Sequence, residues 1–310
     1  FRFTILPATG GFMSDKQVVL ITGTSTGFGK LIAETLARHG HTVYATMRDP
    51  AVRNAQNAAE LRSLVGKESV SLQVLEMDVT DEASVDRAVH TCVEQAGRID
   101  VAINNAGYLL SGLEEACTVD QIRTMMDTNF LGCVRVNRAV LPFMRKQRSG
   151  LLLHVSSLAG RVVVPGSGFY CATKFAMEAM AEAYHYELAQ QGIESCIVEP
   201  GAYQTAVFSN VVQAADHART ETYGAANEIV GKVTAALTAV AADPQEVADA
   251  IVSIIETPAG QRQLRYRVHP VDPGVDQINA VCAQVQATAL QALGVAAETT
   301  FVQHAAAAGD

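Results

Sequence analysis

Short apolar segments alternate with segments of helical periodicity along this chain, and this alternation limits the possible folds more than any other feature. The segments that we predict as strands are 18–22, 42–46, 70–77, 100–103, 151–155, 195–199 and 264–268. The first predicted helix begins at Leu31, and the second is a modest helix that ends at about 65. The other predicted helices cover 82–96, 119–145, 169–191, 243–256 and 274–293. Because strands that alternate with helices form parallel sheets, we predict an α/β fold with a doubly wound parallel sheet covered on both faces.

The length of 310 residues, with 49% hydrophobic residues, is enough to bury a sizeable core. We expect a single domain over 13–300, with Met13 as the native start. Residues 1–12 are expected to be a disordered extension or tag, and 301–310 a frayed tail. The regular pattern fades over about 202–242, which follows the strand at 195–199, and we predict one or two lid helices there.

Charge and cysteine content exclude several classes of function. A net charge of −9 and a pI near 5.4 argue against a nucleic-acid-binding protein, because no basic stripe is available to neutralise phosphates. The six cysteines show no metal-ligand spacing and no disulfide framework, so we expect no metal site and a reducing, cytoplasmic location. No apolar run approaches the roughly 20 residues of a membrane span.

A glycine-rich turn follows the first predicted strand and precedes the first predicted helix. Its residues are Gly23, Thr24, Ser25, Thr26, Gly27, Phe28 and Gly29. Glycines permit a tight turn and close backbone approach, and the helix that follows offers free N–H groups to a pyrophosphate. A glycine cluster alone is more often an ordinary turn, but this order of elements favours a Rossmann-type dinucleotide site. We expect the cofactor to contact Gly23, Ser25, Thr26, Gly27, Phe28 and Gly29.

The ends of the next three strands carry further candidates for cofactor binding. Arg48 follows the second strand, where an NAD enzyme usually has an acid for the ribose, so NADP(H) should be favoured over NAD(H). The alternative is that Arg48 points to solvent or pairs with Asp49. After the third strand, Asp78 could accept from the adenine amino group, beside Val79, or cap the helix that starts near Asp81.

The fourth strand runs into Asn104, Asn105, Ala106 and Gly107, whose small size leaves room for a ribose. We therefore expect Asn105, Ala106 and Gly107 beside the cofactor.

Tyr170 and Lys174 are four residues apart at the start of a predicted helix, which places them on one face. A nearby cation lowers the pKa of a phenol, so Tyr170 is a candidate general acid and base. Ser157 precedes Tyr170 by thirteen positions, and its hydroxyl could hold a substrate oxygen, whereas Ser156 should point to the opposite face. Alone, the Tyr–Lys pair is a weak signal that ordinary surface helices also show.

Two further polar residues have plainer interpretations. Asn129 lies between Met125, Met126 and Phe130, and could be a core amide whose hydrogen bonds are satisfied. His269 lies in a proline-rich loop, where we expect a structural or surface role.

In this order, the glycine turn, Asn104-Asn105-Ala106-Gly107, Asn129, Ser157, Tyr170-x-x-x-Lys174 and Pro200-Gly201-x-x-x-Thr205 resemble the short-chain dehydrogenases/reductases of the single-domain type. The resemblance covers about 16–270, and it is nearest to the hydroxysteroid and retinol dehydrogenase branch. It implies that Tyr170 exchanges a proton with the substrate, Lys174 holds the nicotinamide ribose and lowers the pKa of Tyr170, Ser157 fixes the substrate oxygen, and Asn129 anchors a water relay. It also places Pro200, Gly201, Tyr203 and Thr205 beside the cofactor.

The expected function is an NADP(H)-dependent oxidoreductase that interconverts a secondary alcohol and a ketone or aldehyde. Phe208 and Tyr223 in the predicted lid suggest a hydrophobic or ring-bearing substrate. The alternatives are a cofactor-binding sensor without turnover, and an epimerase or dehydratase like those of longer relatives.

The predicted helices that contain Asn129 and Tyr170 carry apolar residues on more than one face, among them Phe175, Met177, Met180 and Tyr184. We therefore expect a homodimer or homotetramer.

Overall fold

The computed structural model describes residues 16–205, 210–240, 242–269 and 271–304. The expected extension 1–12 and Phe208 lie outside the described residues. Within the described ranges, seven strands form one sheet in the order β3-β2-β1-β4-β6-β7-β9, and every pair is parallel. The strands are β1 (Val18–Ile21), β2 (Thr42–Met47), β3 (Leu72–Glu76), β4 (Val101–Asn104), β6 (Gly150–Val155), β7 (Ile193–Pro200) and β9 (Arg265–Val268). The predicted doubly wound parallel sheet is confirmed.

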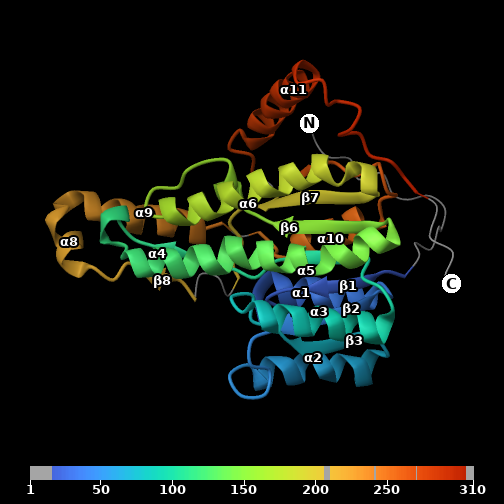
Figure 1. Cartoon of the computed structure of the whole chain (residues 1–310). Helices are drawn as coiled ribbons and strands as arrows, with labels where there is room; N and C mark the ends of the chain where they lie inside the picture. Colours follow the sequence, from blue (N-terminus) through green and yellow to red (C-terminus); the bar gives the residue numbers. More distant parts are fainter. Residues whose placement is uncertain (1–15, 206–209, 241, 270, 305–310) are drawn as a thin grey trace.

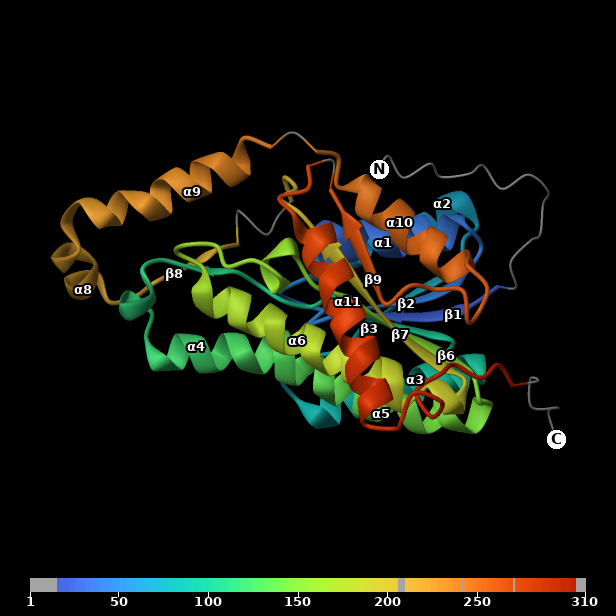
Figure 2. The same cartoon turned by 90° about the horizontal axis from the view of Figure 1, so that it is seen from above.

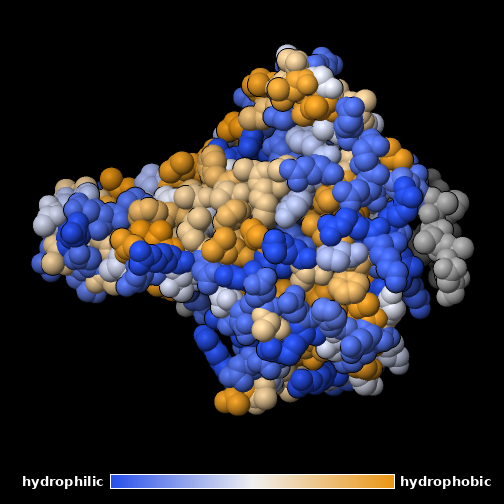
Figure 3. Space-filling model, in the orientation of Figure 1, coloured by the Kyte–Doolittle hydropathy of each residue, from blue (hydrophilic) through white to orange (hydrophobic). Residues whose placement is uncertain are grey.

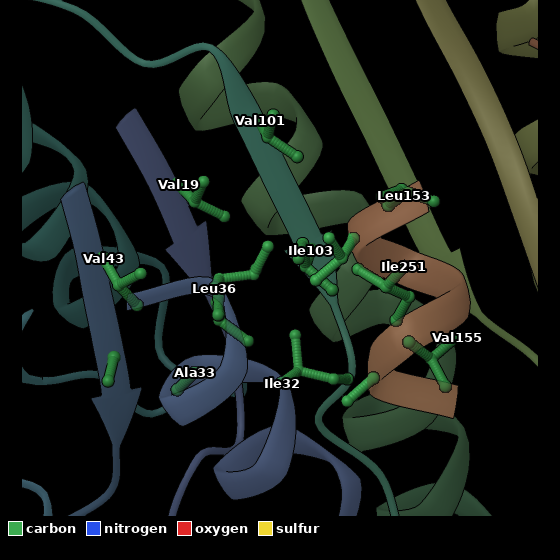
Figure 4. Packing of buried hydrophobic residues seen from close by; sticks show 14 of the residues in the cluster. Val19, Ile32, Ala33, Leu36, Val43, Val101, Ile103, Leu153, Val155 and Ile251 are labelled. Carbon is green, nitrogen blue, oxygen red and sulfur yellow. The ribbon is translucent and has the colours of Figure 1, made fainter. Parts of the chain in front are cut away.

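Helices cover both faces of this sheet (Figures 1 and 2). One face carries α1 (Gly27–Arg38), α2 (Ala55–Glu68) and α10 (Gln245–Glu256), and the other carries α3 (Glu82–Ala96), α5 (Gly132–Gln147) and α6 (Gly168–Glu187). Successive residues of a strand point to opposite faces, so in β1 Val19 packs toward α1 and α10 while Leu20 packs toward α3 and α5. Figure 4 shows Ile32 and Leu36 of α1 beside Ile251 of α10 in the first of these cores.

The predicted helix over 119–145 is divided by a π-helical segment. It consists of α4 (Val119–Met126), the π-helical residues Asp127–Leu131, and α5. Thr118 caps α4 through a capping box with Gln121. A π-helical segment closes its backbone hydrogen bonds over one residue more than an α-helix does, and such segments are often found at functional sites. Asn129 lies inside it.

In the described part of the segment after β7 there are two α-helices, where the fading pattern predicted one or two lid helices. It comprises β8 (Val212–Gln213), α8 (His217–Thr222), a 3₁₀ turn at Gly224–Asn227 and α9 (Glu228–Thr238). It extends sideways from the sheet (Figure 2), and β8 pairs in parallel with β5 (Leu110–Ser111). No residue of α8 or α9 that the structure describes is buried.

The chain continues after β9 into α11 (Val275–Ala292), which stands above the sheet edge in Figure 1. Part of the tail that we expected to be frayed is bound to the domain. The Val302 N–H donates to the Ala189 carbonyl at 3.0 Å, and the Arg148 guanidinium contacts the His304 ring at 2.8 Å. Residues 305–310 lie outside the described part. Among the described helices, none has the length and apolarity needed to cross a membrane.

Candidate active site

The predicted site residues follow the carboxyl ends of neighbouring strands, and the parallel sheet brings those ends to one edge. The order of strands reverses between β1 and β4, and ligands of open α/β sheets bind at such a point. The segments that carry α8 and α9 start from the same edge, because they follow β7. The structure therefore brings the predicted cofactor loops and the predicted lid to one side of the sheet.

The glycine turn packs directly against the loop after β4. Gly23 has φ +71°, and a Cβ on it would lie 2.8 Å from the Cα of Ala106. A Cβ on Gly29 would lie 2.2 Å from the Gly23 carbonyl oxygen. The Asn105 amide donates to the carbonyls of Thr22 and Gly23, at 2.9 and 3.0 Å. Asn105 therefore stabilises the glycine turn, a structural role in addition to the predicted contact with the cofactor.

The start of α1 has the features that a phosphate site requires. Thr26 is the N-cap residue, but its side chain makes no capping hydrogen bond in the described structure. The first N–H groups of the helix consequently keep their hydrogen-bonding capacity for an anion. Ser25 is half-buried and Thr26 is exposed beside them. This geometry fits a dinucleotide pyrophosphate.

The loop after β7 faces the glycine turn, because a Cβ on Gly27 would lie 3.8 Å from the Cβ of Thr205. The side chain of Tyr203, in the same loop, is buried. Its side chain is 2% exposed, and its hydroxyl donates to Glu246 Oε2 at 2.9 Å and to the Val268 carbonyl at 3.1 Å. The ring packs edge-on against Phe28, with centroids 5.6 Å apart. The Tyr203 side chain thus belongs to the core, so the predicted contact with the cofactor would have to come from its backbone.

His269 has the structural role that we expected. Its ring lies where a Cβ on Gly201 would be, 2.3 Å from two ring carbons, and it packs edge-on against Tyr203. Its Nε2 is 3.3 Å from the Ala202 carbonyl. These contacts join the loop after β9 to the Pro200-Gly201 turn.

Arg48 is exposed at the end of β2. Its neighbour Asp49 has φ +44° and accepts from the N–H groups of Val52 and Arg53, both at 3.2 Å. No ion pair within the described residues joins Arg48 to Asp49, so the predicted alternative of a local pair is not formed. The Arg48 charge also lowers the pKa of Tyr108, although burial of that phenol raises it more. The Arg48 guanidinium is therefore available near the loop after β4.

The structure separates the two possible roles of the carboxylates after β3. Asp81 caps α3 by accepting from the Ala83 N–H at 3.0 Å. Asp78 accepts instead from the N–H and hydroxyl of Thr80, at 2.9 and 2.7 Å. Val79 is buried against Gly132 at the start of α5. The cap is thus Asp81, and Asp78 remains at the edge of the sheet.

Tyr170, Lys174 and Ser157 come together at the first two turns of α6. The Lys174 ammonium lies 5.8 Å from the centroid of the Tyr170 ring and donates to the Val155 carbonyl at 2.9 Å. The Ser157 hydroxyl hydrogen-bonds the Tyr170 phenol and also accepts from the Ala159 N–H at 3.1 Å. A phenol, a hydroxyl and an ammonium therefore converge where a carbonyl oxygen could be bound and protonated.

Burial determines the acidity of both ionisable groups. It raises the pKa of Tyr170 to about 12, and the hydrogen bond with Ser157 offsets only part of this increase. Burial also lowers the pKa of Lys174 to about 8, because desolvation disfavours the charged ammonium. The net pKa of Tyr170 is therefore raised, because desolvation of the phenol outweighs the hydrogen bond with Ser157; the lowering of this pKa by Lys174 stays a prediction.

Asn129 is completely buried, and its side-chain hydrogen bonds are satisfied. Its Oδ1 accepts from the Tyr108 N–H at 3.0 Å, and its Nδ2 donates to the Tyr108 carbonyl at 2.9 Å and to Thr173 Oγ1 at 3.2 Å. Thr173 in turn donates to the Tyr170 carbonyl at 2.7 Å. The core-amide interpretation therefore describes the side chain, which ties the loop after β4 to α6.

A cavity of about 100 Å³ lies between α9 and the loops that follow β4 and β6. Its aliphatic lining consists of Leu109, Pro165, Val211, Val230, Val233 and Leu237. The described residues around it also include serine, threonine and glutamine side chains, but no charged one. Tyr223 does not line it, because its hydroxyl donates to Glu115 Oε2 at 2.9 Å on the outside of the lid. In the sequence, the helical spacing of Val230, Val233 and Leu237 is the feature that could have indicated the apolar wall of this cavity.

Comparison with known proteins agrees with this architecture. Residues 17–216 match the family described as short chain dehydrogenase. A 3-ketodihydrosphingosine reductase of Bacteroides thetaiotaomicron is 41% identical over 194 residues, which cover 63% of this chain and 66% of that protein. This chain thus spans just under two thirds of that relative's length.

A 17-beta-hydroxysteroid dehydrogenase type 1 of Mus musculus is 35% identical over 259 residues, covering 81% of this chain and 73% of that protein. A crystal structure of a short-chain dehydrogenase from Streptomyces avermitilis superimposes with a TM-score of 0.73 and 31% identity, covering 92% of this chain and 100% of that one. The chain therefore belongs to the short-chain dehydrogenase/reductase family and is an NAD(P)-dependent oxidoreductase.

Proposed function

We propose that this protein is an NADP(H)-preferring oxidoreductase that interconverts a hydrophobic secondary alcohol and the corresponding ketone or aldehyde. The observation that carries the proposal is the convergence of Tyr170, Ser157 and Lys174 at the carboxyl edge of the sheet, beside an uncapped helix start. The nicotinamide, when bound, supplies or accepts the hydride.

The side chains have distinct tasks in this proposal. Ser157 donates a hydrogen bond to the substrate oxygen and holds it beside the phenol. Tyr170 donates a proton to that oxygen during reduction and accepts one during oxidation. Because its pKa is raised to about 12, the phenol is protonated at neutral pH, which suits proton donation to a carbonyl. The Lys174 ammonium, one helical turn away, stabilises the phenolate as it forms and holds the nicotinamide ribose.

Asn129 contributes by keeping the loop after β4 in place against α6, and we retain the water relay as part of its proposed role. Thr205 faces Gly27 of the glycine turn across the proposed cofactor site, and Gly201 belongs to the same loop after β7. Asp78, Ala106 and Gly107 border the adenosine end. These assignments follow the order of the loops along the sheet edge.

Arg48 is the basis for the preferred cofactor. An exposed guanidinium that is not paired with Asp49 can bind a 2′-phosphate through charge-assisted hydrogen bonds, each contributing about 1.5–3 kcal/mol. One such bond is enough for a preference of about tenfold. Ser25 and Thr26 add hydroxyl groups at the same end.

The cofactor proposal is tested by kcat/KM with NADPH and NADH for wild type, Arg48→Ala and Arg53→Ala. Arg53 is a matched control, because it is an exposed arginine in the same loop. We expect Arg48→Ala to lose about tenfold or more of its efficiency with NADPH while efficiency with NADH stays constant. Arg53→Ala should resemble wild type. A wild-type preference for NADH would overturn the assignment.

The uncharged, aliphatic lining of the cavity under α9 supports a hydrophobic substrate. The two relatives described above are named for a ketosphingoid and a hydroxysteroid, which are both hydrophobic. A turnover screen of aliphatic and cyclic ketones and their alcohols with both cofactors tests the reaction type. Binding of NADPH without turnover of any carbonyl would favour a cofactor sensor instead.

We also propose a homodimer or homotetramer in the cytoplasm. Of the helix residues that suggested assembly, Met177 is fully buried, whereas Phe175 is 41% exposed. Phe175 lies among exposed alanines at 172, 179 and 183, and Figure 3 shows apolar residues gathered over α6. A face of this kind can pair with its copy. The proposed location is supported by the six cysteines, all within the described residues and all free thiols.

A further inference from the structure

Helix α6 holds the end of β6 through three side chains that lie one turn apart on one helix face. Tyr170 contacts Ser157, and Lys174 donates to the Val155 carbonyl at 2.9 Å. Glu178, the next residue in this series, accepts from the Ser156 hydroxyl at 2.8 Å. Three successive residues of the strand end are thus each bound by one of three successive helical turns.

The position of Glu178 is strongly constrained. Its side chain is 2% exposed, and its Oε2 accepts from Arg265 Nε at 3.2 Å and lies 3.8 Å from Arg161 Nη1. The loop that starts at Ser157 turns around this carboxylate, since a Cβ on Gly160 would lie 2.2 Å from Glu178 Oε1 and 2.7 Å from Ser156 Oγ. The carboxylate therefore has one place in the fold, and Ser156 is held at that place.

Glu199 of β7 lies close enough to Glu178 for the two side chains to interact electrostatically. It is completely buried, its Oε2 accepts from Asn279 of α11 at 2.7 Å, and its Oε1 lies 3.5 Å from Arg265 Nε. Burial and the charge of Glu178 raise the pKa of Glu199 to about 8. The Glu178 carboxylate thus receives hydrogen bonds from Ser156 and Arg265.

We propose that Glu178 and Ser156 form a positioning pair that keeps the Ser157 hydroxyl against the Tyr170 phenol; this inference rests on the function proposed above. Neighbouring residues of an extended chain point to opposite faces, so anchoring Ser156 on one side fixes the direction of Ser157 on the other. The side chains of both members are buried, so neither is exposed to a bound cofactor. Losing the anchor should therefore affect the chemical step and leave cofactor binding intact.

The test replaces Ser156, because removing Glu178 would leave the charge of Arg265 buried without a partner and could prevent folding. Ser195→Ala is the matched control. Ser195 is also fully buried, and its hydroxyl donates to the Ala181 carbonyl of α6 at 2.8 Å, far along the helix from Tyr170. Each variant loses one buried serine hydrogen bond to the same helix.

We expect Ser156→Ala to lower kcat by about tenfold or more, with an unchanged KM for NADPH, while Ser195→Ala keeps the wild-type kcat. Retention of more than half of the wild-type kcat in Ser156→Ala would overturn the proposal. An equal loss of kcat in both variants would overturn it too, because the effect would then be one of general packing.

Crystal structures of the two variants give a readout that does not require turnover. The Ser157 hydroxyl should move away from the Tyr170 phenol in Ser156→Ala and stay in place in Ser195→Ala. An unmoved Ser157 in Ser156→Ala would refute the positioning role. A wild-type enzyme that reduces no carbonyl with either cofactor refutes the proposed function instead, and the crystal comparison still decides the role of the pair.

Discussion

Gly29→Ala should damage the fold at the start of α1 although alanine is the better helix former. A Cβ at this position would lie 2.2 Å from the Gly23 carbonyl oxygen and 2.4 Å from Asn105 Nδ2. The first atom belongs to the glycine turn, and the second belongs to the Asn105 amide, which donates to the carbonyls of Thr22 and Gly23. The added methyl group must therefore displace either the backbone of the turn or the Asn105 side chain.

The expected loss in the free energy of unfolding follows from these contacts. Losing the two hydrogen bonds of Asn105 costs about 1 kcal/mol each, and overpacking costs about 1–3 kcal/mol more. The greater helix propensity of alanine returns about 1 kcal/mol. The free energy of unfolding should consequently fall by about 2–4 kcal/mol. Affinity for NADPH should fall as well, because the displaced turn is the proposed phosphate site.

Urea unfolding and titration of NADPH fluorescence measure the two effects. Gly66→Ala is the matched control, since Gly66 lies in helix α2 and a Cβ on it would have no heavy atom within 4 Å outside its local chain. That variant should gain up to about 1 kcal/mol of stability and keep its affinity for NADPH. Equal unfolding midpoints for wild type and Gly29→Ala would refute the packing argument.

Three further predictions concern the reaction, the pH dependence of stability and the assembly. Tyr170→Phe should lower kcat by about 10²–10⁴-fold with little change in the Kd for NADPH, and more than a tenth of the wild-type rate would exclude the acid/base role. The raised pKa of Glu199 means that the folded state keeps a proton which the unfolded state loses, so stability should fall as pH rises from about 4.5 to about 8. Urea unfolding at several pH values should show this slope in wild type and a smaller one in Glu199→Gln; equal slopes would contradict the protonated carboxyl. Light scattering should show a species of two or four 32.9 kDa chains, and only a single-chain species at micromolar concentration would refute the assembly.

The sequence by itself determined the architecture and the position of the main site residues. Strand and helix periodicity act over a few neighbouring residues, so the parallel sheet and its covering helices could be predicted without knowledge of their contacts. The glycine turn and the spacing of Tyr170 and Lys174 are equally local, because one turn and one helical repeat define them. The alternation of side chains along an extended chain is also local, and it indicated that Ser156 and Ser157 point to opposite sides.

Only the tertiary structure decided how these residues are surrounded. The pKa of Tyr170 rises because the tertiary structure partly buries the phenol, and no local pattern reports that burial. Tyr203 turned into the core because Glu246, from a distant helix, binds its hydroxyl. Glu178 and Glu199 meet because α6 and β7 pack together, and α11 adds Asn279 to them. Hydrogen bonds and burial of this kind join residues that are far apart in the chain, and they exist only once the whole domain is assembled.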